Sequence, residues 1–323
     1  MHEPTFRQAL AHSWALVKQK KSLWIFGLLS AVIGQWGLSD FLGAFYRTVN
    51  NGFYFFNQEQ IAALHLDFNW HKLAIILLGL WLLGIILLVV FGLVFVAVGS
   101  RGAIISYGIH YYKTGKILPL HEAWHKGIKK FSPLLGVTLL GRLFQLIDLG
   151  LFAVLARMVL RSNSLGSSFL LVAIGTLAIL VALLFEASII YASGYILLEH
   201  KNVKESLLKG WELLSEHLLV SFELGMVLVL LNVFFLGVAV YGSFISFIPS
   251  LIVWIIAGLT GFNGLILFGM YTGMVFYAMI VLVAAGIFNA FVTCSWVYLF
   301  MKMHHEGVGS RTVIFLKKFF RLS

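Results

Sequence analysis

The sequence predicts an all-α, polytopic membrane helix bundle of about six transmembrane helices, arranged as three hairpin repeats that each follow a cytoplasmic amphipathic interfacial helix. Three observations predict this fold. First, 60% of the 323 residues are hydrophobic and only 11% are charged, whereas soluble domains carry about 25% charged residues. Second, apolar segments recur that are long enough to cross a bilayer, which takes about 20 helical residues. Third, basic residues gather between alternate apolar segments. We therefore expect one integral membrane domain over residues 1–323.

Six apolar segments are the expected spans, and they cover residues 23–38, 73–98, 134–155, 169–198, 218–240 and 273–301. The stretch 241–272 is also mostly apolar but contains Pro249, several glycines and Asn263. We interpret it as a re-entrant or interfacial hairpin, with a further pair of short spans as the alternative. Residues 39–69 are rich in aromatic side chains without a continuous apolar run. They are expected to form an excursion at the level of the lipid headgroups.

The basic residues predict the orientation of the chain. With six spans, 18 of the 23 lysine and arginine residues fall on one side of the membrane. Cytoplasmic loops of membrane proteins carry an excess of basic residues, so we expect both termini in the cytoplasm. The formal net charge of +10 is then explained by topology and by attraction to anionic lipids. We expect membrane lipids as partners and no binding of nucleic acid.

Three cytoplasmic segments share a pattern that suggests an internal repeat. They align on Trp14, Trp124 and Trp211, which we expect to be interfacial anchors, and each has a leucine four residues earlier. This spacing places the two residues on one face of a helix. The expected repeat units cover residues 5–112, 116–200 and 203–303, and a basic amphipathic segment at 310–323 ends the chain. The alternative is that interfacial helices converge on tryptophan and leucine for physical reasons.

The phrases that carry this pattern also carry a resemblance. They are "ALAHSWALVKQKKSLWIFGLLSA", "GAIISYGIHYYKTGKILPLHEAWHKGIKKF" and "LLEHKNVKESLLKGWELL". They resemble a broad group of poorly characterised bacterial multipass membrane proteins, which includes the membrane domain attached to some glycerophosphodiester phosphodiesterases. The resemblance implies six spans, a location in the bacterial inner membrane and no established catalytic residues. The chain has no soluble phosphodiesterase domain, so that activity does not carry over.

The second of these phrases contains H-E-x-x-H, the zinc-binding pattern of many metalloproteases. His121 and His125 would be the metal ligands, and zinc needs at least a third. On a helical wheel both histidines lie at the edge of an apolar stripe of Leu120 and Trp124, and neither recurs in the aligned segments. We therefore expect an interfacial helix with no metal or other cofactor, and keep a zinc protease as a minor alternative. Its third ligand would come from Glu186, Glu199 or His200.

Polar residues inside the spans suggest a different site. If the helix of the second span continues to Tyr112, Arg101 lies 11 residues from its cytoplasmic end. Glu186 and Asn289 each lie 12 residues from the ends of their own spans, and Arg142 lies 10 residues from Ser132. At 1.5 Å per residue this is about 17 Å, so these residues and Gln145 are expected to share one layer near the midplane. Buried charges are costly and mark structural or functional sites. The layer is interpreted either as an ion-pair network that fixes packing or as a positively charged site for an anionic group.

The sequence supports three functions. The first is a non-enzymatic membrane protein that binds or transports lipids or small amphipathic, anionic molecules; we expect Glu186→Gln and Arg142→Ala to impair binding without unfolding it. The second is a structural or assembly factor of a membrane complex, with other membrane proteins as partners. The third is the zinc protease. The single cysteine, Cys294, excludes a disulfide framework and any C-x-x-C motif.

Overall fold

The computed structural model describes residues 5–31, 70–160, 165–262 and 264–306, and the regular secondary structure of these residues is entirely helical. The elements in chain order are α1 (Thr5–Gln19), α2 (Ser22–Ala31), α5 (Trp70–Thr114), α6 (Leu120–Lys129), α7 (Phe131–Leu160), α8 (Leu165–Glu199), α9 (Val203–Glu216), α10 (Leu218–Thr260) and α11 (Gly264–Glu306). The all-α prediction is therefore confirmed. The predicted excursion at 39–69 and the C-terminal segment 310–323 lie outside the described residues.

Five of these helices, α5, α7, α8, α10 and α11, are long and apolar enough to cross a membrane. Their number, length and composition indicate a multipass membrane protein. The remaining predicted span, residues 23–38, is described only as far as the ten-residue α2. The described residues therefore contain five membrane-length helices and one short apolar helix in place of six complete spans.

The stretch 241–272 does form a hairpin, but its two arms are the outer ends of α10 and α11 and not a separate pair of short segments. Helix α10 continues through Pro249 to Thr260, and the chain turns at Gly261, whose φ of 70° suits a residue without a side chain. Helix α11 begins at Gly264 and runs back along α10. Proline breaks helices readily in water, but in an apolar environment a continuous helix keeps the other backbone groups hydrogen-bonded. The alternative of two short additional spans is not seen either.

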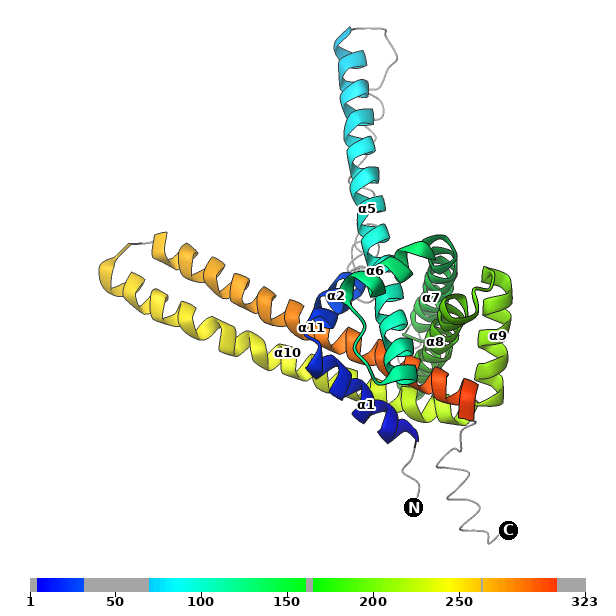
Figure 1. Cartoon of the computed structure of the whole chain (residues 1–323). Coiled ribbons are helices and arrows are strands. Elements are labelled where there is room, and N and C mark those ends of the chain that lie inside the picture. The colour runs from blue at the N-terminus through cyan, green and yellow to red at the C-terminus, as the bar shows by residue number, and fades with distance from the viewer. Residues whose placement is uncertain (1–4, 32–69, 161–164, 263, 307–323) are drawn as a thin grey trace.

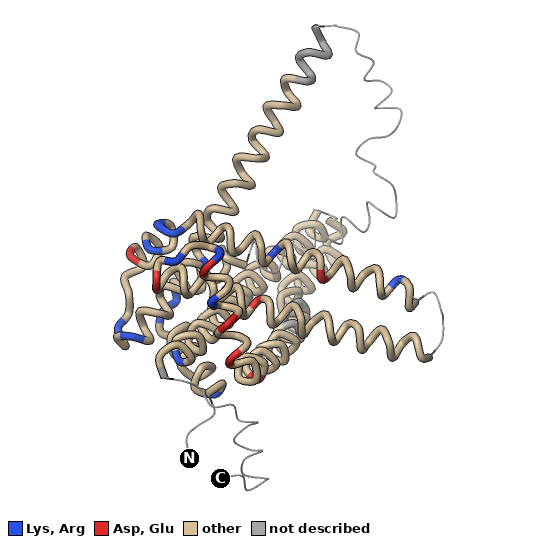
Figure 2. The backbone as a smooth tube through the Cα atoms, turned by 90° about the vertical axis from the view of Figure 1, so that its right-hand side faces the viewer, with Lys and Arg blue, Asp and Glu red and all other residues tan. Residues whose placement is uncertain are grey.

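Three arms extend from a shared base in three different directions (Figures 1 and 2). They are α5, the α7–α8 pair and the α10–α11 pair. Helices α10 and α11 have 43 residues each, which corresponds to about 65 Å. This is twice the hydrocarbon thickness of about 30 Å, so an arm of this length fits a bilayer only with a strong tilt or with its ends in the interface.

The base is held together by the inner halves of α5, α8 and α11, which contact one another. Their largest fully buried side chains include Tyr107, Tyr191 and Phe300, one from each helix. The ring of Tyr191 lies 6.0 Å from that of Trp296 and 6.1 Å from that of Phe300. Lysine and arginine residues also gather around the base (Figure 2). The apolar arms therefore extend from a common core around which most of the described basic residues lie.

Each short amphipathic helix packs against one of these three core helices: α1 against α11, α6 against α5 and α9 against α8. All three end five residues after their tryptophan, at Gln19, Lys129 and Glu216. The residue just before each tryptophan is small and buried, and these residues are Ser13, Ala123 and Gly210. The face that packs is thus the small-residue face beside the tryptophan.

The tryptophans differ in environment because of this packing. Trp14 and Trp211 are 53% and 50% exposed, as expected for anchors at an interface. Trp124, which the sequence places with the other two as an interfacial anchor, is instead half-buried. Its ring stacks on Phe26 of α2 at 5.7 Å and packs closely over Gly99, where the absence of a side chain leaves room for the indole.

Protonation of His12 is expected to weaken this core. The imidazole packs against the rings of Tyr111 and Tyr298, with centroids 4.8 and 4.6 Å away, and burial lowers its pKa below the usual 6.5. The unfolded chain therefore takes up the proton first, and stability falls as the pH drops below about 6.5. We expect the purified protein to lose more thermal stability between pH 7.5 and 5.5 than His12→Phe does. Equal losses would contradict this role of His12.

Candidate functional site

A cavity of about 520 Å³ lies between α7, α8, α5 and α11, and reaches Ser30 of α2. All five residues of the predicted polar layer line it, and they are Arg101, Arg142, Gln145, Glu186 and Asn289. Arg101 and Asn289 are 188 positions apart in the chain and line the same cavity. Counting residues from the span ends could bring them together because every α-helix rises by the same distance per residue.

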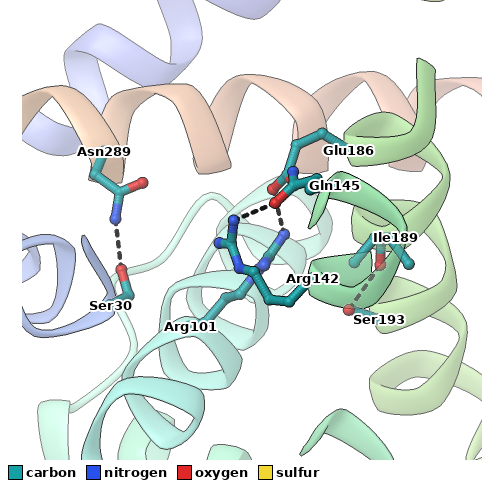
Figure 3. A network of polar contacts seen from close by, with 8 residues as sticks. All are labelled: Ser30, Arg101, Arg142, Gln145, Glu186, Ile189, Ser193 and Asn289. Atoms are coloured by element: carbon teal, nitrogen blue, oxygen red, sulfur yellow. Dashed lines mark hydrogen bonds and ion pairs between the residues drawn. The ribbon is translucent and has the colours of Figure 1, made fainter. Parts of the chain in front are cut away.

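Glu186 is the centre of a charged network within the cavity (Figure 3). Its Oε1 forms an ion pair with Nη2 of Arg101 at 2.6 Å, and its Oε2 accepts a hydrogen bond of 3.0 Å from Nε2 of Gln145. Gln145 in turn accepts a hydrogen bond from the guanidinium of Arg142. Gln145 therefore bridges the acid of α8 to the second arginine, and the network as a whole joins α5, α7 and α8.

Arg142 differs from Arg101 in one respect. Among the described residues, no carboxylate lies within ion-pair distance of its guanidinium, and its only hydrogen bond there goes to Gln145. A guanidinium has five N–H donors, so most of its donor capacity remains for a ligand or water. The two arginines thus have different roles: Arg101 is neutralised by Glu186, and Arg142 is the cation left for another group.

Asn289 lines the same cavity but belongs to a separate contact. Its Nδ2 donates to the backbone oxygen of Gly27 at 2.8 Å and to Oγ of Ser30 at 2.6 Å. The hydroxyl of Ser30 also donates to the Gly27 oxygen at 3.1 Å. Asn289 therefore ties α11 to α2, and Figure 3 shows it apart from both arginines, with its dashed line going to Ser30. The predicted single layer consists of two clusters at similar depth.

Asp148 is a lining residue that sequence reasoning missed. It lies three residues after Gln145 and six after Arg142, so all three share one face of α7, and this spacing could have revealed it. The predicted net positive charge applies to the inner end of the cavity. Over the whole lining, Glu186 and Asp148 balance Arg101 and Arg142 when all four are ionised.

The cavity is polar at one end and apolar at the other. Beyond Asp148 it is lined by Leu149 and Phe152 of α7, and by Gly175, Ala178, Ile179 and Ala182 of α8. These residues continue outward along the α7–α8 arm. The space therefore offers a charged inner end followed by an apolar channel that extends about one helical turn along α7 and about two turns along α8.

The H-E-x-x-H motif lies elsewhere, on the outer face of α6. The rings of His121 and His125 are exposed and 6.3 Å apart. Two suggested third ligands have other partners: Glu186 pairs with Arg101, and Glu199 pairs with Lys201 at 2.8 Å. Within the described part of the chain, no three histidine, cysteine or acidic side chains are grouped to hold a metal ion.

The fold and the cavity together define a class, a helical multipass membrane-type protein with an amphipathic, charge-lined cavity between its arms. Comparison with known proteins adds no family to this description. No protein-family model, curated protein or solved structure matches the chain. The resemblance noted in the sequence therefore stays a prediction.

Proposed function

We propose that this chain is a non-enzymatic integral membrane protein that binds an amphipathic molecule with an anionic head, as a carrier or a binding module. The observation that carries the proposal is the position of Arg142. It is a guanidinium without a carboxylate partner among the described residues, at the inner end of a cavity that continues as an apolar channel. A phosphate or carboxylate head would pair with Arg142, and an alkyl chain would lie against Leu149 and Phe152.

Two physical arguments support this ligand class. Guanidinium groups bind phosphate and carboxylate in paired, charge-assisted hydrogen bonds, which are stronger where water is scarce. The volume of about 520 Å³ is in the range of small-molecule sites, which are mostly apolar with a few polar groups that fix orientation. The neighbouring ion pair of Arg101 and Glu186 would hold Gln145, and through it Arg142, in place.

The same proposal includes an orientation and an origin. The base with its basic helices would face the cytoplasm, in agreement with the positive-inside rule, and the arms would cross a bacterial inner membrane. Helices α1, α6 and α9 end at the same distance from their tryptophan and pack through the same face, which supports three duplicated units. In this arrangement α6 and α9 each pack against the last long helix of the preceding unit, and α1 packs against the last long helix of the third unit, α11.

Binding of decyl phosphate tests the proposal, with decyl maltoside as an uncharged probe of equal chain length. Native mass spectrometry of the purified protein measures the fraction that retains one molecule. We expect Arg142→Ala to weaken retention of decyl phosphate by about tenfold or more, because a hydrogen bond to a charged group contributes about 1.5–3 kcal/mol. Retention of decyl maltoside should change little.

Arg157→Ala is the matched control. Arg157 is an exposed arginine near the far end of the same helix and does not line the cavity. The control should therefore retain decyl phosphate like the unaltered protein. If Arg142→Ala and Arg157→Ala bind the probe equally well, the proposed site is wrong.

A further inference from the structure

A second cavity, of about 580 Å³, lies where α1 crosses the α10–α11 arm. It shares no lining residue with the first cavity. Its walls are almost entirely apolar and include five aromatic rings, those of Trp14, Phe234, Phe235, Phe288 and Phe291. Such a wall suits a flexible hydrocarbon chain and offers nothing to hold a polar head.

The rings form an open groove on the side of the arm. Trp14 meets Phe291 edge to face at 6.0 Å, and Phe235 stacks on Phe288 at 4.9 Å. Phe234 is 70% exposed, and Trp14 is more than half exposed. A chain can therefore enter sideways, from the apolar surroundings of the arm, and lie against these rings.

Helix α1 supplies charge at both ends of the groove. Arg7, Ala11, Trp14 and Lys18 follow one another at spacings of four, three and four residues, so they form one stripe along the helix. Both basic side chains are exposed, and α1 contains no acidic residue. Along α1 the apolar groove is therefore bordered by cationic side chains, which are complementary to an anionic head on an apolar tail.

From this arrangement we propose that the groove between α1 and the α10–α11 arm binds an acyl chain of an anionic phospholipid, whose phosphate pairs with Lys18 or Arg7. The bound lipid fixes α1 against α10 and α11 at the membrane surface. This site is separate from the one proposed for the first cavity, because the two share no lining residue, although α11 contributes residues to both.

Photo-crosslinking locates the lipid. Phosphatidylglycerol and phosphatidylcholine that carry the same diazirine-bearing acyl chain are added separately to the purified full-length protein, irradiated, and the labelled peptides are identified. We expect phosphatidylglycerol to label residues 8–18 of α1 and the facing parts of α10 and α11 at least about fivefold more than phosphatidylcholine, since each basic residue near a membrane favours anionic lipid by about that factor.

Three variants complete the test. Trp14→Ala and Lys18→Gln should each lower labelling of α1 by phosphatidylglycerol severalfold, while circular dichroism shows unchanged helix content. Trp211→Ala is the control, because Trp211 is equally exposed on α9 and lines neither cavity; it should leave labelling of α1 unchanged. Equal labelling by the two lipids, or crosslinks of α1 to another protein chain instead of lipid, would overturn the proposal.

Discussion

Glu186→Leu is expected to destabilise the protein by up to about 3 kcal/mol, the lower end of the cost of removing one partner from a buried ion pair, because this pair is only partly buried. The substitution leaves Arg101, whose side chain is only 13% exposed, without a counter-charge and leaves the amide of Gln145 without its acceptor. Glu186 also neutralises the inner end of the cavity, so Arg142 would then face a second uncompensated cation. The ion pair therefore gives Glu186 a structural role, and Glu186→Gln is expected to affect the fold as well as binding.

A double-variant cycle separates the pair from its surroundings. Unfolding of the purified protein in mixed micelles is followed for Glu186→Leu, Arg101→Leu and the double variant. The double variant has no isolated charge at this site, because both partners are leucine. Its loss of unfolding free energy should therefore be smaller than the sum of the two single losses, by about 1 kcal/mol or more. Additive losses would mean that Arg101 and Glu186 do not interact in the folded protein.

Gly27→Ala is expected to have an effect of similar size. A Cβ atom at Gly27 would lie 2.0 Å from the backbone oxygen of Gly286, and one at Gly286 would lie 2.4 Å from the backbone oxygen of Trp24. Backbone atoms cannot move aside as a flexible side chain can, so α2 must separate from α11. Separation would also break the hydrogen bonds of Asn289 to Gly27 and Ser30. We expect a loss of about 3 kcal/mol, the upper part of the range for overpacking.

The control for this substitution is Gly84→Ala. Gly84 lies in the outer part of α5, where a Cβ atom would meet nothing within 4 Å, and alanine favours a helix over glycine by up to about 1 kcal/mol. Thermal unfolding should therefore shift clearly downward for Gly27→Ala and stay unchanged or rise slightly for Gly84→Ala. Similar shifts for both variants would contradict the close α2–α11 contact.

Hydropathy predicted the helices well where composition alone decides them, as in α7 and α8, and it failed at Pro249. There the proline and glycines suggested a break, but the helix continues because its backbone has no better way to satisfy its hydrogen bonds in apolar surroundings. Helix ends that the sequence placed at Val240 and Gly273 were therefore about 20 and 10 residues too short.

The sequence predicted how far along their helices the residues of the candidate site lie, but not which way their side chains point around each helix axis. Counting residues from the span ends placed Arg101, Glu186 and Asn289 at one height, and all three line the cavity. The count contains no information about rotation around each helix axis, and so it did not separate Asn289, which faces α2, from the arginines. The same limit explains Trp124, because a helical wheel ranks faces by polarity, whereas α6 packs through the small residues Ala123 and Gly127.

The position of a bound amphiphile tests the central claim most directly. An experimental structure of the protein with decyl phosphate in a lipid nanodisc would show where the phosphate lies. The account predicts a phosphate within hydrogen-bond distance of the Arg142 guanidinium, with the alkyl chain along Leu149 and Phe152. A cavity without the amphiphile while Arg142 pairs with a carboxylate of the chain itself would contradict it.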